Sequence, residues 1–371
     1  MVNSLARQTQ PSVATSRITG KNMAMHTDYQ GREKVAAFFG AHAAAVDRCE
    51  SDIRPGIRML GELGLLDLGV PDTTQGRLAS MLLVVEDVAS ACLSSAFALW
   101  AQRMVIDYLS SSDRPASTSE LAGLRAGTRI GATAIAPAMR HVAGLEPVPV
   151  VATRTSSGVR LNGPINWASN LFDDALVAVP ARFEDGSGMV VHVRTTDPGV
   201  TVHSAPDLLT LGATASSSVT LTDVEVPAAA ILSEDLPGFV RSFRPTLLLI
   251  QSAYCSGLTG ASRHHIGERL TGLNAEFTDD FAELAQRHDS VRRRLFDFAQ
   301  APHRSSSRDL LRLRLGAART AGEATGLEAT VRGGAGYVAS SGTSRRLREA
   351  AFLPIQAPTE GQLRWHLAQF E

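Results

Sequence analysis

The sequence has no long apolar run and no recognisable secretory signal. Its apolar runs, such as those at residues 80–85 and 246–250, are far shorter than the roughly 20 residues that cross a bilayer. The first 30 residues are polar and irregular, and they lack the apolar core of about 7 to 15 residues that a signal peptide needs. We therefore expect a soluble, cytoplasmic protein with no membrane partner.

The chain also has few cysteines and almost no net charge. The chain carries 36 Lys and Arg against 37 Asp and Glu, for a net charge of -1, which argues against a nucleic-acid partner but leaves room for a small anionic ligand. Its three cysteines, Cys49, Cys92 and Cys255, lie far apart and form no CxxC pair. We expect them to be buried free thiols in a reducing cytosol.

The length and the spacing of apolar residues indicate several domains. A chain of 371 residues exceeds the roughly 250 to 300 residues above which single cores tend to split. Helical periodicity marks residues 32–108 and returns after residue 238. We predict a flexible arm at 1–30, an N-terminal helical domain at 31–129, a central β domain at 130–233 and a C-terminal helical bundle at 234–371. Bundle helices are expected at 239–270, 279–299 and 306–330.

The middle of the chain has the character of a small antiparallel β domain. Short runs rich in Val and Thr are cut there by Pro, Asn-Gly and Asp-Gly, which are strand and turn signals. The clearest strand candidates are residues 148–154, 158–162, 175–181, 188–194 and 216–221.

Four stretches, taken in order, resemble the acyl-CoA dehydrogenase family over nearly the whole chain. LGLLDLGVP at 63–71, GATAIAP at 131–137, LNGPINWASN at 161–170 and LGA…VTLTDVEVP at 211–227 are similar to the family's LGL…P, ALTEP, LNGxKxWITN and LGxRxS…FxDVxVP stretches. Each stretch alone fits an ordinary turn or strand, so their order and spacing carry the resemblance. It implies an α+β fold with an N-terminal helical domain, a central antiparallel β-barrel-like domain and a C-terminal helical bundle.

The resemblance implies FAD as the cofactor. It places Trp167 against the flavin ring and Ser169 near flavin N5, where a hydroxyl can donate a hydrogen bond. Ser169 stands where the family has threonine, and the donor is kept. Backbone groups for the flavin pyrimidine would come from Thr133, Ala134, Ile135 and Ala136.

The adenine end of the cofactor matches the family less well. Arg269 and Phe277 are what remains of the family's RxxFGxP stretch, while residues 330–337 resemble QxxGGxGY with Thr330 in place of Gln. Gly333 and Gly334 would allow close backbone approach to a pyrophosphate, commonly that of a neighbouring subunit. A homodimer or homotetramer is therefore expected, although a plain turn between helices is as good an interpretation of the glycines alone.

The catalytic base is the least family-like element. The family has a glutamate in a YEG segment, and an ungapped comparison puts Ala357 there, which cannot accept a proton. A three-residue insertion instead puts Glu360 at the base position. The alternative for Glu360 is a surface carboxylate beside a turn.

Other groups of charged residues favour ordinary structural interpretations. His264 and His265 with Glu268 have helical spacing, but adjacent histidines point to different faces, so no metal is predicted. The arginines at 292–294, 312 and 314 are most simply a solvated helix face, and contact with coenzyme A phosphates is the secondary interpretation.

The leading functional hypothesis is an FAD-dependent oxidoreductase that α,β-dehydrogenates an acyl thioester carried by coenzyme A or a carrier protein. It would need an electron acceptor, or oxygen. A flavin-dependent monooxygenase on the same fold requires no proton-abstracting base, which suits Ala357. A third possibility is a non-catalytic subunit or binding module that has lost the cofactor, as the changes at Ile135, Ala136 and Thr330 would allow.

Overall fold

The computed structural model describes residues 28–70, 77–112 and 117–370. The arm expected at 1–30 lies almost entirely outside these ranges, as does the proline that ends the first family-like stretch. None of the helices in the described ranges combines the length and apolar character needed to cross a membrane.

Among the residues that the structure describes, five helices precede the sheet, and two of them are buried on nearly every face. Pro55 stands in the first turn of the second helix, where a missing N–H costs nothing. The third and fourth helices are mostly apolar and are buried on nearly all sides, which is typical of helices inside a core. The five are α1 (Arg32–Asp47), α2 (Arg54–Glu62), α3 (Leu78–Ala91), α4 (Leu93–Ser110) and α5 (Ser117–Arg125).

The middle of the chain forms one eight-stranded sheet. Its strands are β1 (Gly131–Thr133), β2 (Val151–Arg154), β3 (Gly158–Ala168), β4 (Leu176–Arg182), β5 (Gly188–Arg194), β6 (Val200–Val202), β7 (Ser217–Pro227) and β8 (Ile231–Ser233). The order is β6-β7-β3-β2-β4-β5-β8, with β1 paired to β4 beside this path. A short helix α6 (Ala136–Val142) follows β1, and a 3-10 turn η1 (Gly212–Thr214) precedes β7.

The sheet corrects two expectations. It is mixed, because β1 runs parallel to β4 and β2 meets β4 in a parallel bridge, while the other pairs are antiparallel. It is also open: β6 and β8 end the strand order, so no barrel forms. The parallel pairing was missed because β1 is three residues long, too short for its sequence to show a strand period.

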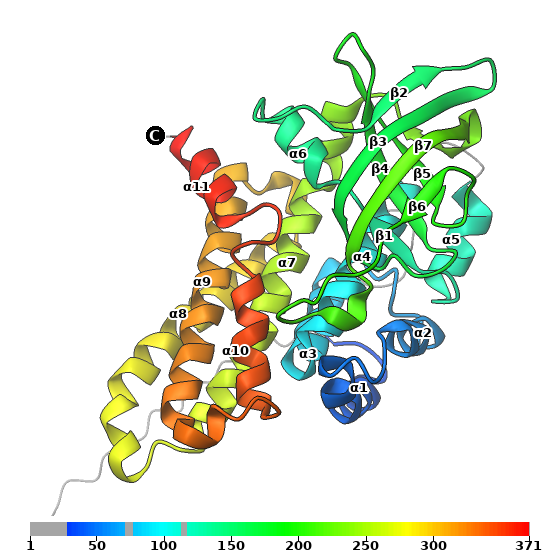
Figure 1. Cartoon of the computed structure of the whole chain (residues 1–371). Helices are drawn as coiled ribbons and strands as arrows, with labels where there is room; N and C mark the ends of the chain where they lie inside the picture. The colour runs from blue at the N-terminus through cyan, green and yellow to red at the C-terminus, as the bar shows by residue number, and fades with distance from the viewer. Residues whose placement is uncertain (1–27, 71–76, 113–116, 371) are drawn as a thin grey trace, which may run out of the picture.

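The C-terminal helices pack side by side in a bundle next to the sheet (Figure 1). The predicted helical periods are confirmed, and the prolines at 354 and 358 lie between the last two helices. The helices are α7 (Leu236–Gly267), α8 (Thr278–Ala299), α9 (Ser307–Arg332), α10 (Gly342–Phe352) and α11 (Glu360–Ala368), with a 3-10 turn η5 (Gly333–Gly336) after α9.

Two expectations about side chains were wrong. Cys49 is exposed, whereas Cys92 and Cys255 are buried as predicted. Arg314 is fully buried in α9, not solvated. Its guanidinium donates to Gln251 Oε1 at 3.0 Å, and also to the carbonyl of Leu353 at 3.0 Å, so amide and carbonyl oxygens solvate the charge.

Asn170 joins the helical and β parts through a fully buried amide. Its Nδ2 donates to the carbonyl of Ala98 in α4 and to that of Gly131 at the start of β1, both at 3.0 Å. Its backbone N–H donates to the carbonyl of Thr214 at 2.7 Å. The backbone of Asn170 is left-handed, with φ 65°, a conformation that asparagine tolerates better than other residues with side chains. One residue therefore holds a helix, a strand and a turn in register.

Glu349 makes a second buried link, between α10 and α4. Its Oε1 accepts a hydrogen bond from the backbone N–H of Leu93, in the first turn of α4, at 3.0 Å. Arg345 lies 3.9 Å away, and the other carboxyl oxygen has no hydrogen-bond partner within the described residues. Burial raises the pKa of Glu349 to about 7, against the weaker lowering effect of Arg345.

Asn170→Ala should destabilise the protein by about 3 kcal/mol, because two buried carbonyls lose their donor, and a left-handed alanine is strained. Urea unfolding at neutral pH measures this. Asn162→Ala is the matched control, since Asn162 is exposed and pairs with Asp223 on the surface; it should cost less than about 1 kcal/mol. Equal losses in the two variants would contradict the role given to Asn170.

Glu349→Gln should change how stability depends on pH. The raised pKa means that the folded protein holds a proton that the unfolded chain releases, so stability falls as pH rises from about 4.5 to about 7. A glutamine side chain at this position has no such proton to hold. The variant should therefore gain about 2 kcal/mol relative to wild type on going from pH 5 to pH 7.5, at roughly 1.4 kcal/mol per pKa unit. Parallel stability curves would rule this out.

Candidate functional site

The end of β3 presents the first two predicted cofactor residues together. Trp167 is 61% exposed, which is unusual for so large an apolar side chain, while the neighbouring Ala168 is buried in the core. Ser169 follows directly and is half-buried. Ser169 stands at a bend one residue past the end of β3, two residues after Trp167. An exposed indole beside a hydroxyl can stack on a flat ring and hydrogen-bond its edge.

Behind Ser169 lies a row of hydroxyl groups. Ser169 Oγ is 2.6 Å from Ser216 Oγ, and Ser216 Oγ is 2.7 Å from Thr214 Oγ1. Thr214 Oγ1 in turn donates to the carbonyl of Leu211 at 2.7 Å. Sequence reasoning gave Thr214 and Ser216 no role, although both lie in the fourth family-like stretch.

The predicted pyrimidine contacts lie where β1 passes into α6, and they match only partly. The N–H of Ala134 donates to the carbonyl of Ala178, so it is occupied by the sheet. Ile135 buries its side chain, and its carbonyl accepts from the N–H of Ala138. Within the described residues, the N–H groups of Ile135 and Ala136 have no backbone partner, and Thr133 ends the strand. Backbone donors therefore remain at two of the four positions.

The predicted adenine-end residues meet at the end of the bundle remote from the sheet, where α9 turns into α10 (Figure 1). Arg269 lines a cavity of about 210 Å³ there, together with Arg332, Arg346 and the Ser341 that caps α10. Gly333 ends α9 with φ 63° and ψ -149°, a backbone conformation open almost only to glycine. Gly334 follows and is exposed.

This cavity is electropositive, and sequence reasoning found only one of its arginines. Arg269 and Arg332 have no ion-pair partner in the part of the chain that the structure describes, whereas Arg346 is paired with the buried Glu328. Unpaired guanidinium groups at the N-terminus of α10 favour an anionic group such as a phosphate. Arg332 could have been noticed beside the glycines, but Arg346 is brought there only by the turn between the helices.

The base candidate Glu360 lies at the first position of α11, and it does not line the arginine-lined cavity. Its carboxylate contacts Arg319 at 2.8 Å and Arg364 at 2.5 Å. These guanidinium groups, Arg319 first, hold the pKa of Glu360 below its ordinary value. At the alternative position, Ala357, the backbone carbonyl accepts a hydrogen bond from Gln251 Nε2 at 3.0 Å.

Two further basic groups face each other between α7 and α11. Arg244 is half-buried and has no ion-pair partner among the described residues. Burial lowers the pKa of Arg244. Burial also lowers the pKa of His366 to about 4, and the charge of Arg244 adds to this lowering. A guanidinium without an ion-pair partner among the described residues, beside an uncharged imidazole that can donate an N–H, suits an anionic ligand. Sequence reasoning missed both.

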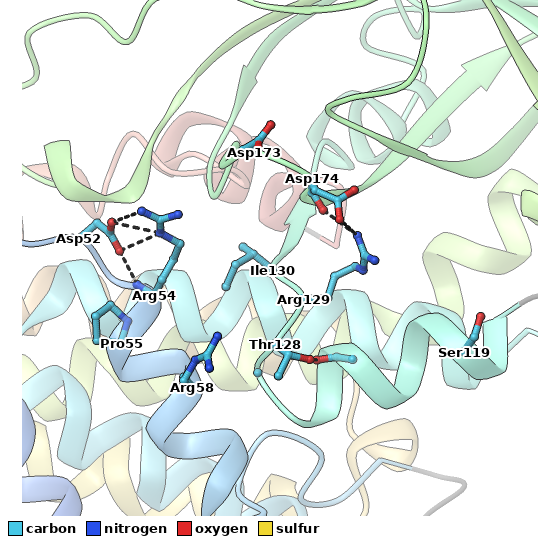
Figure 2. A pocket seen from close by; sticks show the side chains of 12 residues that line it. Asp52, Arg54, Pro55, Arg58, Ser119, Thr128, Arg129, Ile130, Asp173 and Asp174 are labelled. Atoms are coloured by element: carbon cyan, nitrogen blue, oxygen red, sulfur yellow. Dashed lines mark hydrogen bonds and ion pairs between the residues drawn. The ribbon is translucent and has the colours of Figure 1, made fainter.

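A further cavity, with a volume of about 630 Å³, lies between α2, α5 and the start of β1 (Figure 2). Arg54 pairs there with Asp52 at 2.7 Å, and Arg129 pairs with Asp174. Arg58 and Asp173 stand on opposite sides in Figure 2. None of the predicted cofactor or catalytic residues lines this cavity, so we do not assign it to the flavin.

His264, His265 and Glu268 come closer than expected. Glu268 lies 3.4 Å from His264 and 3.6 Å from His265, because its long side chain reaches both imidazoles. The expectation that the adjacent histidines diverge was wrong, and the three ligand atoms lie within 4.8 Å of one another. The group is largely exposed, and the absence of a metal there stays a prediction.

The residues present fit a flavin at two separate places. The exposed indole with its hydroxyl suits the ring system, and the arginine-lined cavity suits phosphates. The two places lie in the sheet and at the remote end of the bundle, so one chain does not bring them together (Figure 1). The β1–α6 junction fits less well, because the sheet already uses one of its donors.

Comparison with known proteins places this geometry in context. No protein-family model matches the chain. A curated relative, the probable acyl-CoA dehydrogenase YngJ of Bacillus subtilis, is 26% identical over 343 residues, which cover 85% of this chain and 88% of YngJ. Butyryl-CoA dehydrogenase of Megasphaera elsdenii has a TM-score of 0.81 at 19% identity, covering 92% of this chain and 97% of that one.

A glutaryl-CoA dehydrogenase of Mycobacterium smegmatis, solved in complex with FADH2, has a TM-score of 0.77 at 16% identity, covering 92% and 94% of the two chains. The resemblance predicted from the four stretches is thereby confirmed. The chain has the fold of the acyl-CoA dehydrogenases, and it resembles that family in sequence over most of its length.

Proposed function

We propose that the protein is an FAD-dependent oxidoreductase of the acyl-CoA dehydrogenase type, which α,β-dehydrogenates an acyl thioester carried by coenzyme A or a carrier protein. The observation that carries the proposal is the similarity to YngJ, which spans all three parts of the fold, and not the sheet alone. The shared fold and the names of the structural relatives support an enzyme of this family.

The chain's own residues would hold FAD at two places. Trp167 would stack on the ring system, Ser169 would lie at its edge, and the N–H groups of Ile135 and Ala136 would bind the pyrimidine. Bound FAD supplies the hydride acceptor that no side chain can provide. Arg269 and the backbone at Gly333 and Gly334 would bind the pyrophosphate.

A second copy of the chain accounts for the distance between these places. Leu273 and Tyr337, which are 91% and 92% exposed, flank the predicted adenine-end residues in sequence. Large apolar side chains so exposed indicate a contact surface. A homodimer or homotetramer would cover them and would bring one copy's arginines to the flavin ring site of another.

The thioester carrier is a phosphate-bearing molecule, whether coenzyme A or a phosphopantetheinyl protein. Arg244 is suited to bind such a phosphate, since it has no ion-pair partner among the described residues, and the uncharged imidazole of His366 can donate an N–H beside it. The electron acceptor would be a separate protein or a small molecule. One solved chain that shares this fold comes from work on the electron transferring flavoprotein of Acidaminococcus fermentans, which supports a protein acceptor.

A flavin-dependent monooxygenase is the second candidate, and one observation favours it. Ala357 stands at the base position of the ungapped comparison, and Glu360 is held by two arginines, so neither is an evidently free base. Anaerobic titration with acyl-CoAs, set against oxygen uptake with a flavin reductase, separates the two reactions. Bleaching without oxygen indicates a dehydrogenase.

The purified protein should bind FAD and show a flavin visible spectrum. Arg269→Gln should raise the FAD dissociation constant about tenfold, or ~1.4 kcal/mol, because a charged contact to a phosphate is lost. Arg287→Gln is the matched control: Arg287 pairs with Glu283 and Glu323 on the surface and should leave the affinity unchanged. A protein that stays colourless with added FAD would point to the non-catalytic subunit.

Glu360→Gln tests the base. If Glu360 abstracts the α-proton, the variant should bind FAD normally but lose acyl-dependent bleaching of the flavin by more than about a hundredfold in rate. Arg364→Gln, which removes one ion-pair partner only, controls for loosening of α11. Bleaching that persists in the Glu360 variant eliminates this residue and leaves the monooxygenase as the better candidate.

A further inference from the structure

The row of hydroxyls behind Ser169 has a definite direction. Thr214 is fully buried and Ser216 nearly so, while Ser169 is half-buried and forms the outer end. Successive oxygens are 2.6 to 2.7 Å apart, and the inner end meets the carbonyl of Leu211 at 2.7 Å. At such distances each pair of oxygens must share a hydrogen, because two facing lone pairs would repel.

Counting hydrogens assigns every donor. A carbonyl oxygen can only accept, so the hydroxyl of Thr214 must donate its hydrogen bond to the carbonyl of Leu211. Thr214 has no second hydrogen, and Ser216 must therefore donate to Thr214. The hydrogen of Ser216 is then used, so Ser169 must donate to Ser216. The Ser169 oxygen has only lone pairs left for anything bound at the end of β3.

We propose that Thr214 and Ser216 are positioning residues that make Ser169 a hydrogen-bond acceptor toward a flavin, and that they thereby favour the reduced over the oxidised cofactor. The inference rests on the proposed FAD site. Oxidised flavin offers a lone pair at N5, which meets another lone pair on Ser169. Reduced flavin offers an N–H, which Ser169 can accept. The direction is opposite to the donor role expected from the sequence.

Two variants release the hydrogen of Ser169. Thr214→Val removes the inner acceptor, so Ser216 can donate to Ser169 instead. Ser216→Ala removes the partner of Ser169 altogether. In both, Ser169 becomes free to donate to oxidised flavin, whereas its ability to accept from reduced flavin is kept.

The measurement is the dissociation constant of oxidised and of reduced FAD for each protein, together with the midpoint potential of the bound flavin. Both variants should lower the dissociation constant of oxidised FAD about tenfold and leave that of reduced FAD nearly unchanged. The potential should fall by about 30 mV, which is a tenfold change for a two-electron couple. If Thr214 and Ser216 had only a structural role, the variants would weaken the binding of oxidised and of reduced FAD to the same extent.

Thr214→Ser keeps the hydroxyl and should retain the wild-type ratio of the two dissociation constants. Together with Ser216→Ala, it keeps the inference testable if the valine variant does not fold. Ser217→Ala is the matched control, because this buried neighbour donates to the carbonyls of His203 and Ser204 and not to the row. Unchanged ratios in Thr214→Val and Ser216→Ala, with FAD bound, would overturn the inference and leave the proposed function standing. A wild-type protein that binds no FAD would overturn both.

Discussion

The buried amide of Asn170 is the contact on which the arrangement of the molecule depends. It donates to one carbonyl in α4 and one in β1, and its own backbone donates to the turn before β7. Water cannot replace these bonds, because all the groups are sealed in the core. The left-handed backbone at this residue lies two residues past the end of β3, so the chain turns directly after Trp167 and Ser169 at a corner of the sheet.

The same corner contains the most specific chemistry in the chain. A carbonyl at one end of three hydroxyls is enough to orient all of them, since each oxygen has only one hydrogen to give. Buried dipoles that are oriented before a ligand arrives need not reorganise when its charge changes. Asn170 and Thr214 are adjacent through a backbone hydrogen bond, so the structural link and the hydroxyl row form one unit.

In other parts of the molecule, the partners and pKa of a charged side chain depend more on how deeply it is buried than on its residue type. Arg314 is buried without a carboxylate because amide and carbonyl oxygens solvate it, whereas Glu360 is near the surface and is paired with two arginines. Burial raises the pKa of Glu349 to about 7, although Arg345 lies nearby. None of these three environments is evident from charge patterning along the chain, which is why the arginine at 314 was taken for a solvated one.

The sequence by itself determined the order of helical and β segments, the long bundle helices, most strands and the resemblance to acyl-CoA dehydrogenases, because these depend on periodicity and local turn chemistry. It did not reveal the parallel pairing of β1 or the open sheet, since pairing partners are chosen by contacts between distant residues. The direction of the hydroxyl row and the placing of Arg332 and Arg346 beside Arg269 were decided only by the tertiary structure. Hydrogen bonds and clustered charges join residues that are far apart in the chain, and no local pattern encodes their distance or orientation.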